Sequence, residues 1–199
     1  MNTVLRVNTR TGDIRALECS PEELHWGGRA FIAHHVLAEV NPACDALGRG
    51  NKLIVASGLL ADTAVSTAGR VSLGGKSPLT GGVKEANVGG AAGRCMARLG
   101  LKALILEDAP DDPDALGAPG TPSAQPRVLL VTKDGARLLE APELRGQETS
   151  PTLAALRDRF GEQIGALCVG PAGEMRLTAA VIATTDHTGV QLRVAGRGG

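Results

Sequence analysis

The chain is poor in aromatic residues and has no excess of charge. Two Phe, one Trp and no Tyr occur among its 199 residues, which almost excludes the aromatic platforms on which single-stranded nucleic acid stacks. Lysine plus arginine and aspartate plus glutamate both total 21, a balance that directs the chain neither to nucleic acid nor to an anionic membrane. The sequence also shows no membrane-length apolar run and no export leader. We therefore expect a cytoplasmic protein.

Paired cysteines of the kind that hold metal clusters are missing as well. Cys19, Cys44, Cys95 and Cys168 are widely separated and form no CxxC motif. Such a pattern is typical of reduced, mostly buried thiols. We expect no iron–sulfur cluster held by this chain alone, because such clusters need several cysteine ligands.

The hydrophobic pattern predicts one α+β domain over residues 1–199. Apolar residues make up 43% of the chain and alternate with polar ones in strands or recur at helical spacing. Strands and hairpins are expected at 3–18, 51–58, 70–77, 101–107, 127–141 and 166–184, and helices at 27–40, 92–99 and 150–161. Ser150 is the expected N-cap of the last helix.

Two further features concern the organisation of the domain. Residues 108–126 are rich in proline and predict a surface loop. The segment 166–173 repeats the pattern of 53–60, and "VAGR" at 194–197 repeats "TAGR" at 67–70. These echoes predict two related α+β halves that arose by internal duplication.

The stretch "KSPLTGGVKEANVGGAAG", residues 76–93, is rich in glycine. We interpret it as a connection whose glycines let either a helix pack closely on a sheet or a ligand approach the backbone. A nucleotide-hydrolysing loop does not fit, because Arg70 stands where that motif needs its first glycine. A dinucleotide fingerprint fails in the same way at Val88.

An anionic ligand fits the residues around these glycines. "NVGGAAG" directly precedes a predicted helix, and free amides at a helix N-terminus, here around Gly90, bind phosphate when glycine allows it to approach. Arg70 and Lys76 flank the stretch, and Arg193 and Arg197 lie in a second glycine loop. Two such loops suit a bulky polyanion better than a single phosphate.

Five segments taken in order resemble the N-terminal domain of tungsten-dependent aldehyde:ferredoxin oxidoreductases. They are "NKLIVASG", "GRVSLGGKSPLTGG", "ANVGG", "VGPAGE" and "RVAGRGG", and the likeness covers nearly the whole chain. The resemblance implies that the two α+β halves form a base for a metal cofactor. In this cofactor two pterin dithiolenes hold tungsten, or molybdenum, and magnesium bridges their phosphates.

The resemblance also assigns residues to the cofactor. Arg70 corresponds to the pterin-contacting arginine of the family, and the backbone carbonyls of Asn87 and Val194 correspond to its two magnesium ligands. Lys76, which flanks the glycine-rich stretch, and Gly90, which follows Gly89, are added to this set. The expected cofactor-binding residues are Arg70, Lys76, Asn87, Gly89, Gly90, Arg193, Val194, Gly196 and Arg197.

In this family the complete enzyme oxidises an aldehyde, or a related carbonyl, and passes electrons through an iron–sulfur cluster to ferredoxin. The cysteine ligands of that cluster, and the substrate-side Glu and His, belong to later domains that these 199 residues do not contain. We therefore expect the chain to be inactive alone and to act with C-terminal domains or a partner subunit.

Departures from the family pattern support a second hypothesis. "GLLADT" at 58–63 replaces the usual "GPLTGT", Ala91 and Ala92 replace an aromatic pair, and the segment 184–199 is longer than usual. A non-catalytic carrier or partner protein could keep the fold without the cofactor. A glycine-rich nucleotide-binding module is the remaining alternative.

Several polar residues are open to both a structural and a functional interpretation. His34 and His35 are adjacent on a predicted helix, where we expect partly exposed surface histidines rather than metal ligands. Asp186 with His187 could act as a base or stabilise a turn. Glu174 could lie beside the cofactor or cap a turn.

Overall fold

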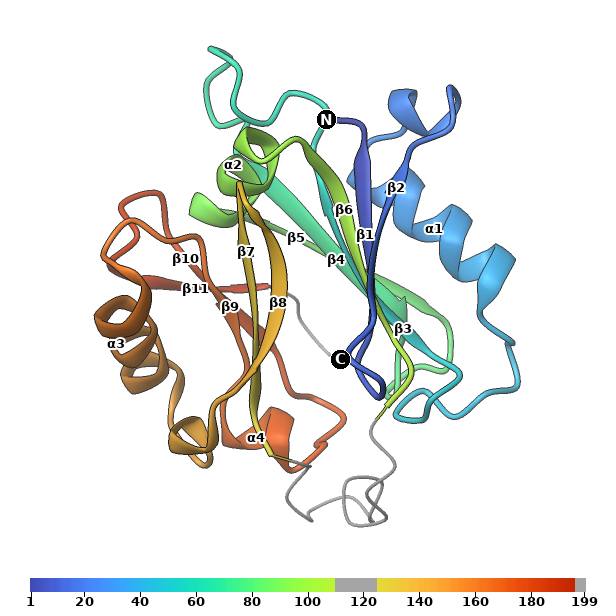
Figure 1. Cartoon of the computed structure of the whole chain (residues 1–199). Helices are drawn as coiled ribbons and strands as arrows, with labels where there is room; N and C mark the ends of the chain where they lie inside the picture. The colour runs from blue at the N-terminus through green and yellow to red at the C-terminus, as the bar shows by residue number, and fades with distance from the viewer. Residues whose placement is uncertain (110–124, 196–199) are drawn as a thin grey trace.

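The computed structural model describes residues 1–109 and 125–195, and the first of these ranges is built on a six-stranded sheet (Figure 1). The strands lie side by side in the order β2-β1-β6-β3-β4-β5. Their bounds are β1 Thr3–Asn8, β2 Ile14–Glu18, β3 Lys52–Ser57, β4 Arg70–Lys76, β5 Val83–Gly89 and β6 Leu101–Glu107. The β1–β6 pair is parallel and the other pairs are antiparallel.

Helix α1, Gly28–Glu39, covers one face of this sheet (Figure 1). Its apolar side buries Phe31, Ile32 and Val36 against Ile54 and Ile105 of the sheet. A short 3₁₀ helix, η1 Glu23–His25, precedes α1. The helix therefore closes the first hydrophobic core.

The opposite face is covered by α2, Ala91–Arg98, and by the second described range. That range contains η3 Pro142–Leu144, α3 Thr149–Phe160, α4 Pro171–Glu174 and the strands β7 Arg127–Thr132, β8 Gly135–Glu140, β9 Leu167–Cys168, β10 Ile182–Thr185 and β11 Leu192–Ala195. β7 and β8 form a hairpin, and the other three form a sheet in the order β11-β10-β9. A second core joins these elements to the large sheet.

The mixed α and β content and the predicted hairpins are confirmed. Each predicted helix is present within about two residues, and each predicted strand region contains strand. The prediction for the start of α3 was wrong, because the helix begins at Thr149 and no side chain caps it. Internal duplication stays a prediction, and most of the expected loop at 108–126 lies outside the described residues.

Two strands were missed: β11, which holds Arg193 where a second glycine loop was expected, and β5 in the glycine-rich stretch. Val83–Gly89 pairs along its whole length with β4 and forms one edge of the sheet. Its sequence lacks an apolar alternation because half-buried Lys84 and Glu85 stand in its first half. Backbone pairing with β4, which a sequence pattern does not show, determines this strand.

The described residues contain no helix that is long and apolar enough to cross a membrane.

Candidate anion-binding site

Two arginines from distant parts of the chain meet beside Gly89. Arg70 begins β4 and lies opposite Gly89, the last residue of β5. Arg193 lies on β11, which packs against β5. A Cβ atom placed on Gly89 would lie 3.5 Å from Nη1 of Arg70 and 3.7 Å from Nη1 of Arg193. We call Arg70 and Arg193 the arginine pair.

The arginine pair has no acidic partner among the described residues. Arg70 donates hydrogen bonds to the side-chain oxygen of Asn87 and, over 3.2 Å, to the Asn87 carbonyl. Arg193 makes neither a hydrogen bond nor an ion pair within the described part of the chain. Two neighbouring guanidinium groups repel each other unless an anion lies between them. The geometry therefore suits an anionic ligand.

The two carbonyls expected to hold magnesium come from neighbouring strands. Asn87 lies on β5 and Val194 on β11, and these strands pack together. The Asn87 side chain also donates to Oγ of Ser72 over 3.0 Å, which fixes its orientation. A carbonyl oxygen accepts two hydrogen bonds or metal contacts, so the Asn87 carbonyl keeps one acceptor position beside its bond from Arg70.

The glycines around the site are needed for different structural reasons. A Cβ on Gly90 would lie 2.1 Å from the Thr185 carbonyl oxygen, and one on Gly93 would lie 2.8 Å from the Arg70 carbonyl oxygen. These two glycines let α2 and its N-cap pack against the strands. At Gly89 no such clash exists, and a side chain would fill only the space beside the arginine pair. Packing and ligand access therefore apply at different glycines.

The structure does not bring Lys76 to this site. Lys76 ends β4 at the opposite end from Arg70, and its ammonium donates to the Pro42 carbonyl over 2.6 Å and to the Cys44 carbonyl. Lys76 therefore lies apart from the arginine pair, and its assignment to the cofactor stays a prediction. Gly196 and Arg197 lie outside the described residues.

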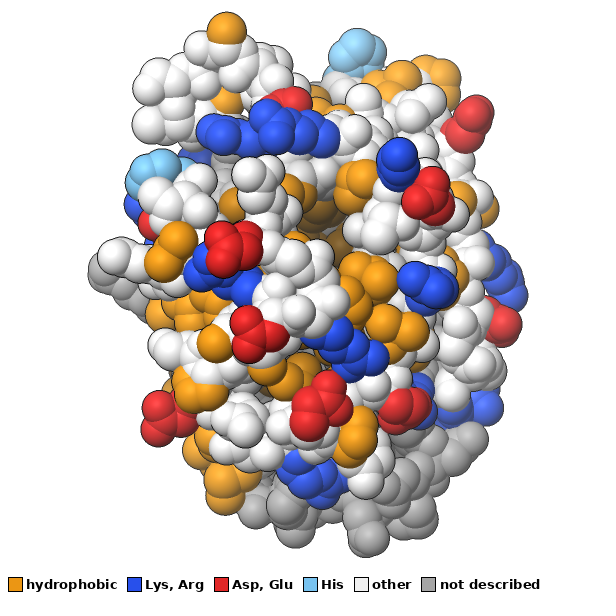
Figure 2. Space-filling model, turned by 60° about the vertical axis from the view of Figure 1, so that its left-hand side comes forward, with side chains coloured by type: hydrophobic (Ala, Val, Ile, Leu, Met, Phe, Trp, Pro, Cys, Tyr) orange, Lys and Arg blue, Asp and Glu red, His pale blue; other side chains and the backbone are white. Residues whose placement is uncertain are grey.

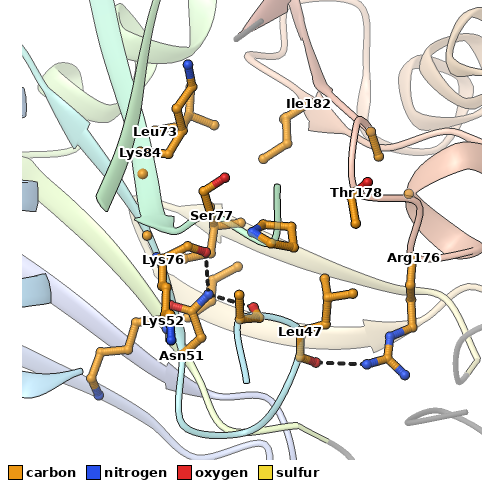
Figure 3. A pocket seen from close by; sticks show the side chains of 18 of the residues that line it. Leu47, Asn51, Lys52, Leu73, Lys76, Ser77, Lys84, Arg176, Thr178 and Ile182 are labelled. Atoms are coloured by element: carbon orange, nitrogen blue, oxygen red, sulfur yellow. Dashed lines mark hydrogen bonds between the residues drawn. The ribbon is translucent and has the colours of Figure 1, made fainter. Parts of the chain in front are cut away.

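A cleft of about 420 Å³ lies at the Lys76 end of the β4–β5 hairpin (Figure 3). Its walls include Leu47, Leu73 and Ile182, and Arg176 lies at one side, where it donates to the Leu47 carbonyl over 3.1 Å. The face in Figure 2 is likewise hollowed at its centre, with hydrophobic side chains in the hollow and charged ones around it. The arginine pair does not line the cleft.

Asp186 and Glu174 have structural roles. Asp186 is buried, and its carboxylate accepts hydrogen bonds from the hydroxyl and backbone N–H of Thr188 and from the N–H of Gln191. The Thr188 hydroxyl holds the pKa of Asp186 below its usual value, helped by the backbone bonds. Glu174 accepts the backbone N–H of Gly146 over 2.9 Å. Both carboxylates therefore stabilise turns.

The histidines and cysteines show no arrangement for binding a metal. His34 is exposed, and His35 is half-buried between Glu23 and Glu39, 2.8 Å from each carboxylate. The four cysteines are free and half-buried. Within 1–109 and 125–195, no group of three or more His, Cys, Asp or Glu side chains could hold a metal ion.

Comparison with known proteins places the chain among the N-terminal domains of oxidoreductases. Residues 4–199 match the family described as "Aldehyde ferredoxin oxidoreductase, N-terminal domain". The chain belongs to this family, which confirms the resemblance seen in its sequence.

Curated relatives are tungsten-containing aldehyde ferredoxin oxidoreductases. The protein from Pyrococcus furiosus is 34% identical over 199 residues and that from Thermococcus kodakarensis 33%, each match covering 98% of this chain. The chain spans 30% of the length of these relatives. A solved complex, titled "Active site complex BamBC of Benzoyl Coenzyme A reductase in complex with 1,5 Dienoyl-CoA", shares the fold. Its TM-score is 0.81 at 22% identity, over 99% of this chain and 30% of that one.

Proposed function

We propose that this chain is the pterin-binding N-terminal domain or subunit of an oxidoreductase that acts on an aldehyde or a related carbonyl. The observation that carries the proposal is the arginine pair beside Gly89, which has no acidic partner in the described part of the chain. The pair belongs to a chain whose curated relatives are named as tungsten-containing enzymes. A phosphorylated pterin supplies the negative charge that this pair lacks.

The residues at the site fit such a cofactor. Arg70 and Arg193 would donate hydrogen bonds to its oxygens, since guanidinium groups suit phosphate geometry. Gly89 would leave room for the cofactor, and the Asn87 and Val194 carbonyls would bind magnesium, which prefers oxygen ligands. The residues Gly90, Gly196 and Arg197 complete the proposed set. When bound, the tungsten or molybdenum centre supplies the two-electron redox chemistry.

The rest of the enzyme is part of the proposal. A chain that spans 30% of its relatives' length would act with C-terminal domains or a partner subunit. These would supply the iron–sulfur cluster and the substrate-side residues and would pass electrons to ferredoxin in the cytoplasm. This chain would bind and orient the cofactor and would be inactive alone.

A non-catalytic carrier that keeps the fold is the second candidate. Its support is the altered segment 58–63 and the pair Ala91 and Ala92. Asp62 takes the place of a family glycine and adopts φ 59°, a left-handed conformation that favours glycine. Its carboxylate pairs with Arg98 over 3.0 Å. The segment therefore holds a glycine-like backbone conformation at this position, which is expected of either candidate because both keep the fold.

The test is the composition of the native complex. The protein would be purified anaerobically from its native host, its tungsten, molybdenum and iron measured, and co-purifying chains identified by mass spectrometry. We expect tungsten or molybdenum with a pterin, together with iron–sulfur domains on the same polypeptide or on a partner. A complex that contains those domains but neither metal would contradict the proposal and favour the carrier.

A further inference from the structure

The side chains of Arg70, Asn87 and Ser72 form a hydrogen-bonded network on one face of the large sheet. Ser72 and Asn87 lie directly opposite each other in the β4–β5 pair, and Arg70 lies two residues before Ser72 on β4. All three side chains therefore leave the same face. The Asn87 amide donates to Oγ of Ser72 over 3.0 Å, and its oxygen accepts from Nε of Arg70. Asn87 thus connects a serine to one arm of the arginine pair.

This network determines which edge of the Arg70 guanidinium is left for a ligand. Nε and Nη2 donate to the side-chain oxygen and to the main-chain carbonyl of Asn87. Nη1 carries two further N–H donors and makes no hydrogen bond within the described part of the chain. It is also the atom that lies 3.5 Å from the position of a Cβ on Gly89. Asn87 therefore holds one edge of the guanidinium and directs the other toward the space beside Gly89.

The orientation of the Asn87 amide depends in turn on Ser72. The amide oxygen has to face Arg70, because a guanidinium has donors only. The NH₂ group then lies toward Oγ of Ser72, its acceptor among the described residues. Without that hydroxyl the NH₂ group would lose this acceptor, and the side chain would be free to turn away from Arg70.

The Ser72 hydroxyl is buried under the start of α1. Ser72 is 3% exposed and lies between the buried Val71 and Leu73 on β4. A Cβ on Gly28, the first residue of α1, would lie 2.8 Å from Oγ of Ser72, so the glycine leaves room for this hydroxyl. A buried hydroxyl costs free energy unless it is hydrogen-bonded. Ser72 is too deeply buried to touch a ligand, so any contribution that it makes to binding passes through Asn87.

We propose that Ser72 is a positioning residue of the anion-binding site, which acts through Asn87 to hold Nη1 of Arg70 toward the ligand. The inference rests on the proposed function and goes beyond it, since the resemblance assigned no role to Ser72. Removing the hydroxyl would leave every ligand-contacting group in place. The Arg70 guanidinium would then have to be ordered when the ligand binds, and ordering a long side chain reduces affinity.

The test is the affinity of the chain for inorganic pyrophosphate, measured by isothermal titration calorimetry at low salt and without magnesium. Ser72→Ala should weaken binding about fivefold, a change within the range expected for ordering one long side chain. In an Asn87→Ala background the same substitution should change the affinity less than about twofold, because the residue through which Ser72 acts is gone. This double-mutant cycle separates positioning from a general effect on the fold.

Ser57→Ala is the matched control. Ser57 is also fully buried, lies on the neighbouring strand β3, and donates to the Leu101 carbonyl over 3.4 Å. Its loss should reduce stability without weakening pyrophosphate binding, because it contacts no residue of the network. Melting curves of all variants check that folded protein is titrated.

The outcomes separate this inference from the proposed function. If Arg70→Gln weakens binding but Ser72→Ala does not, the positioning role is overturned and the proposed site stands. The same loss from Ser72→Ala with and without Asn87, or an equal loss in Ser57→Ala, would also overturn it. A wild type that binds no pyrophosphate would overturn the inference, while the metal content of the native complex would still decide the proposed function.

Discussion

Two groups of cations in this molecule differ in their counter-charges. One group is Arg6 and Lys52, which lie where α1 ends over β1, β3 and β6. Together with the carboxylates of Glu39 and Glu107 we call it the paired cluster. Each cation there contacts both carboxylates. Among the residues that the structure describes, the arginine pair contacts no carboxylate. The described part of the chain thus neutralises cations that join its own elements and supplies no carboxylate to those beside Gly89.

The difference indicates that charged side chains with partners stabilise the fold, whereas those without partners are available to a ligand. Burial raises the pKa of Glu39, but hydrogen bonds from Arg6 and His35 outweigh burial and lower it to about 2. The carboxylate is therefore stabilised by the fold itself. The arginine pair is exposed, gains no such contact from the described residues, and is therefore open to an anionic ligand.

The largest expected effect comes from removing the arginine pair. The double variant Arg70→Gln/Arg193→Gln should weaken pyrophosphate binding by on the order of 10²–10⁴-fold, since it removes two hydrogen bonds of roughly 1.5–3 kcal/mol each. Thermal melting should stay the same or rise slightly, because a repulsive pair is lost. Calorimetric titration and melting curves measure the two effects. A large fall in melting temperature would mean that the pair serves the fold.

Two adjacent glycines sharpen the comparison. Gly90→Ala should lower the free energy of unfolding by about 1–3 kcal/mol, as overpacking does, because its Cβ would collide with the Thr185 carbonyl. Gly89→Ala should leave stability unchanged and weaken pyrophosphate binding about tenfold, or about 1.4 kcal/mol. Urea unfolding and titration of both variants check this. Equal stability losses would contradict the assignment of Gly89 to the ligand.

Removing a carboxylate from the paired cluster should lower stability and leave pyrophosphate binding unchanged, the opposite of removing the arginine pair. Glu39→Gln should reduce the free energy of unfolding by about 1–2 kcal/mol, between the values for exposed and buried ion pairs. Pyrophosphate affinity should not change, because Glu39 contacts neither arginine of the pair. Urea unfolding with a parallel titration measures both. A loss of affinity would show that the two groups are coupled.

The smallest expected effect is on acid stability. The folded pKa of Glu39 is about 2, below its ordinary 4.5. Its contribution is therefore complete above about pH 4.5 and is lost as the pH falls toward about 2. The free energy of unfolding of Glu39→Gln should depend less steeply on pH across this window than that of the wild type. Parallel slopes would show that Glu39 is not stabilised in the folded state.

The sequence predicted local structure better than the meeting of distant residues. Helix α1 and strand β4 follow from hydrophobic spacing alone, whereas β5 depends on pairing with β4. The separation of Lys76 from the arginine pair was predictable, because a strand over 70–77 rises about 3.3 Å per residue and separates Arg70 from Lys76 by roughly 20 Å. The approach of Arg193 to Gly89 was not predictable from local pattern, because it depends on how β11 packs against β5. Only the family resemblance assigned both residues to the same cofactor.

The most direct test of the central claim is anomalous diffraction from crystals of the native, metal-loaded complex, recorded at the tungsten or molybdenum absorption edge. The account predicts that the cofactor holding the metal contacts Arg70 and Arg193 beside Gly89. A cofactor located elsewhere on this domain, with the arginine pair bound to carboxylates of a later domain instead, would contradict it.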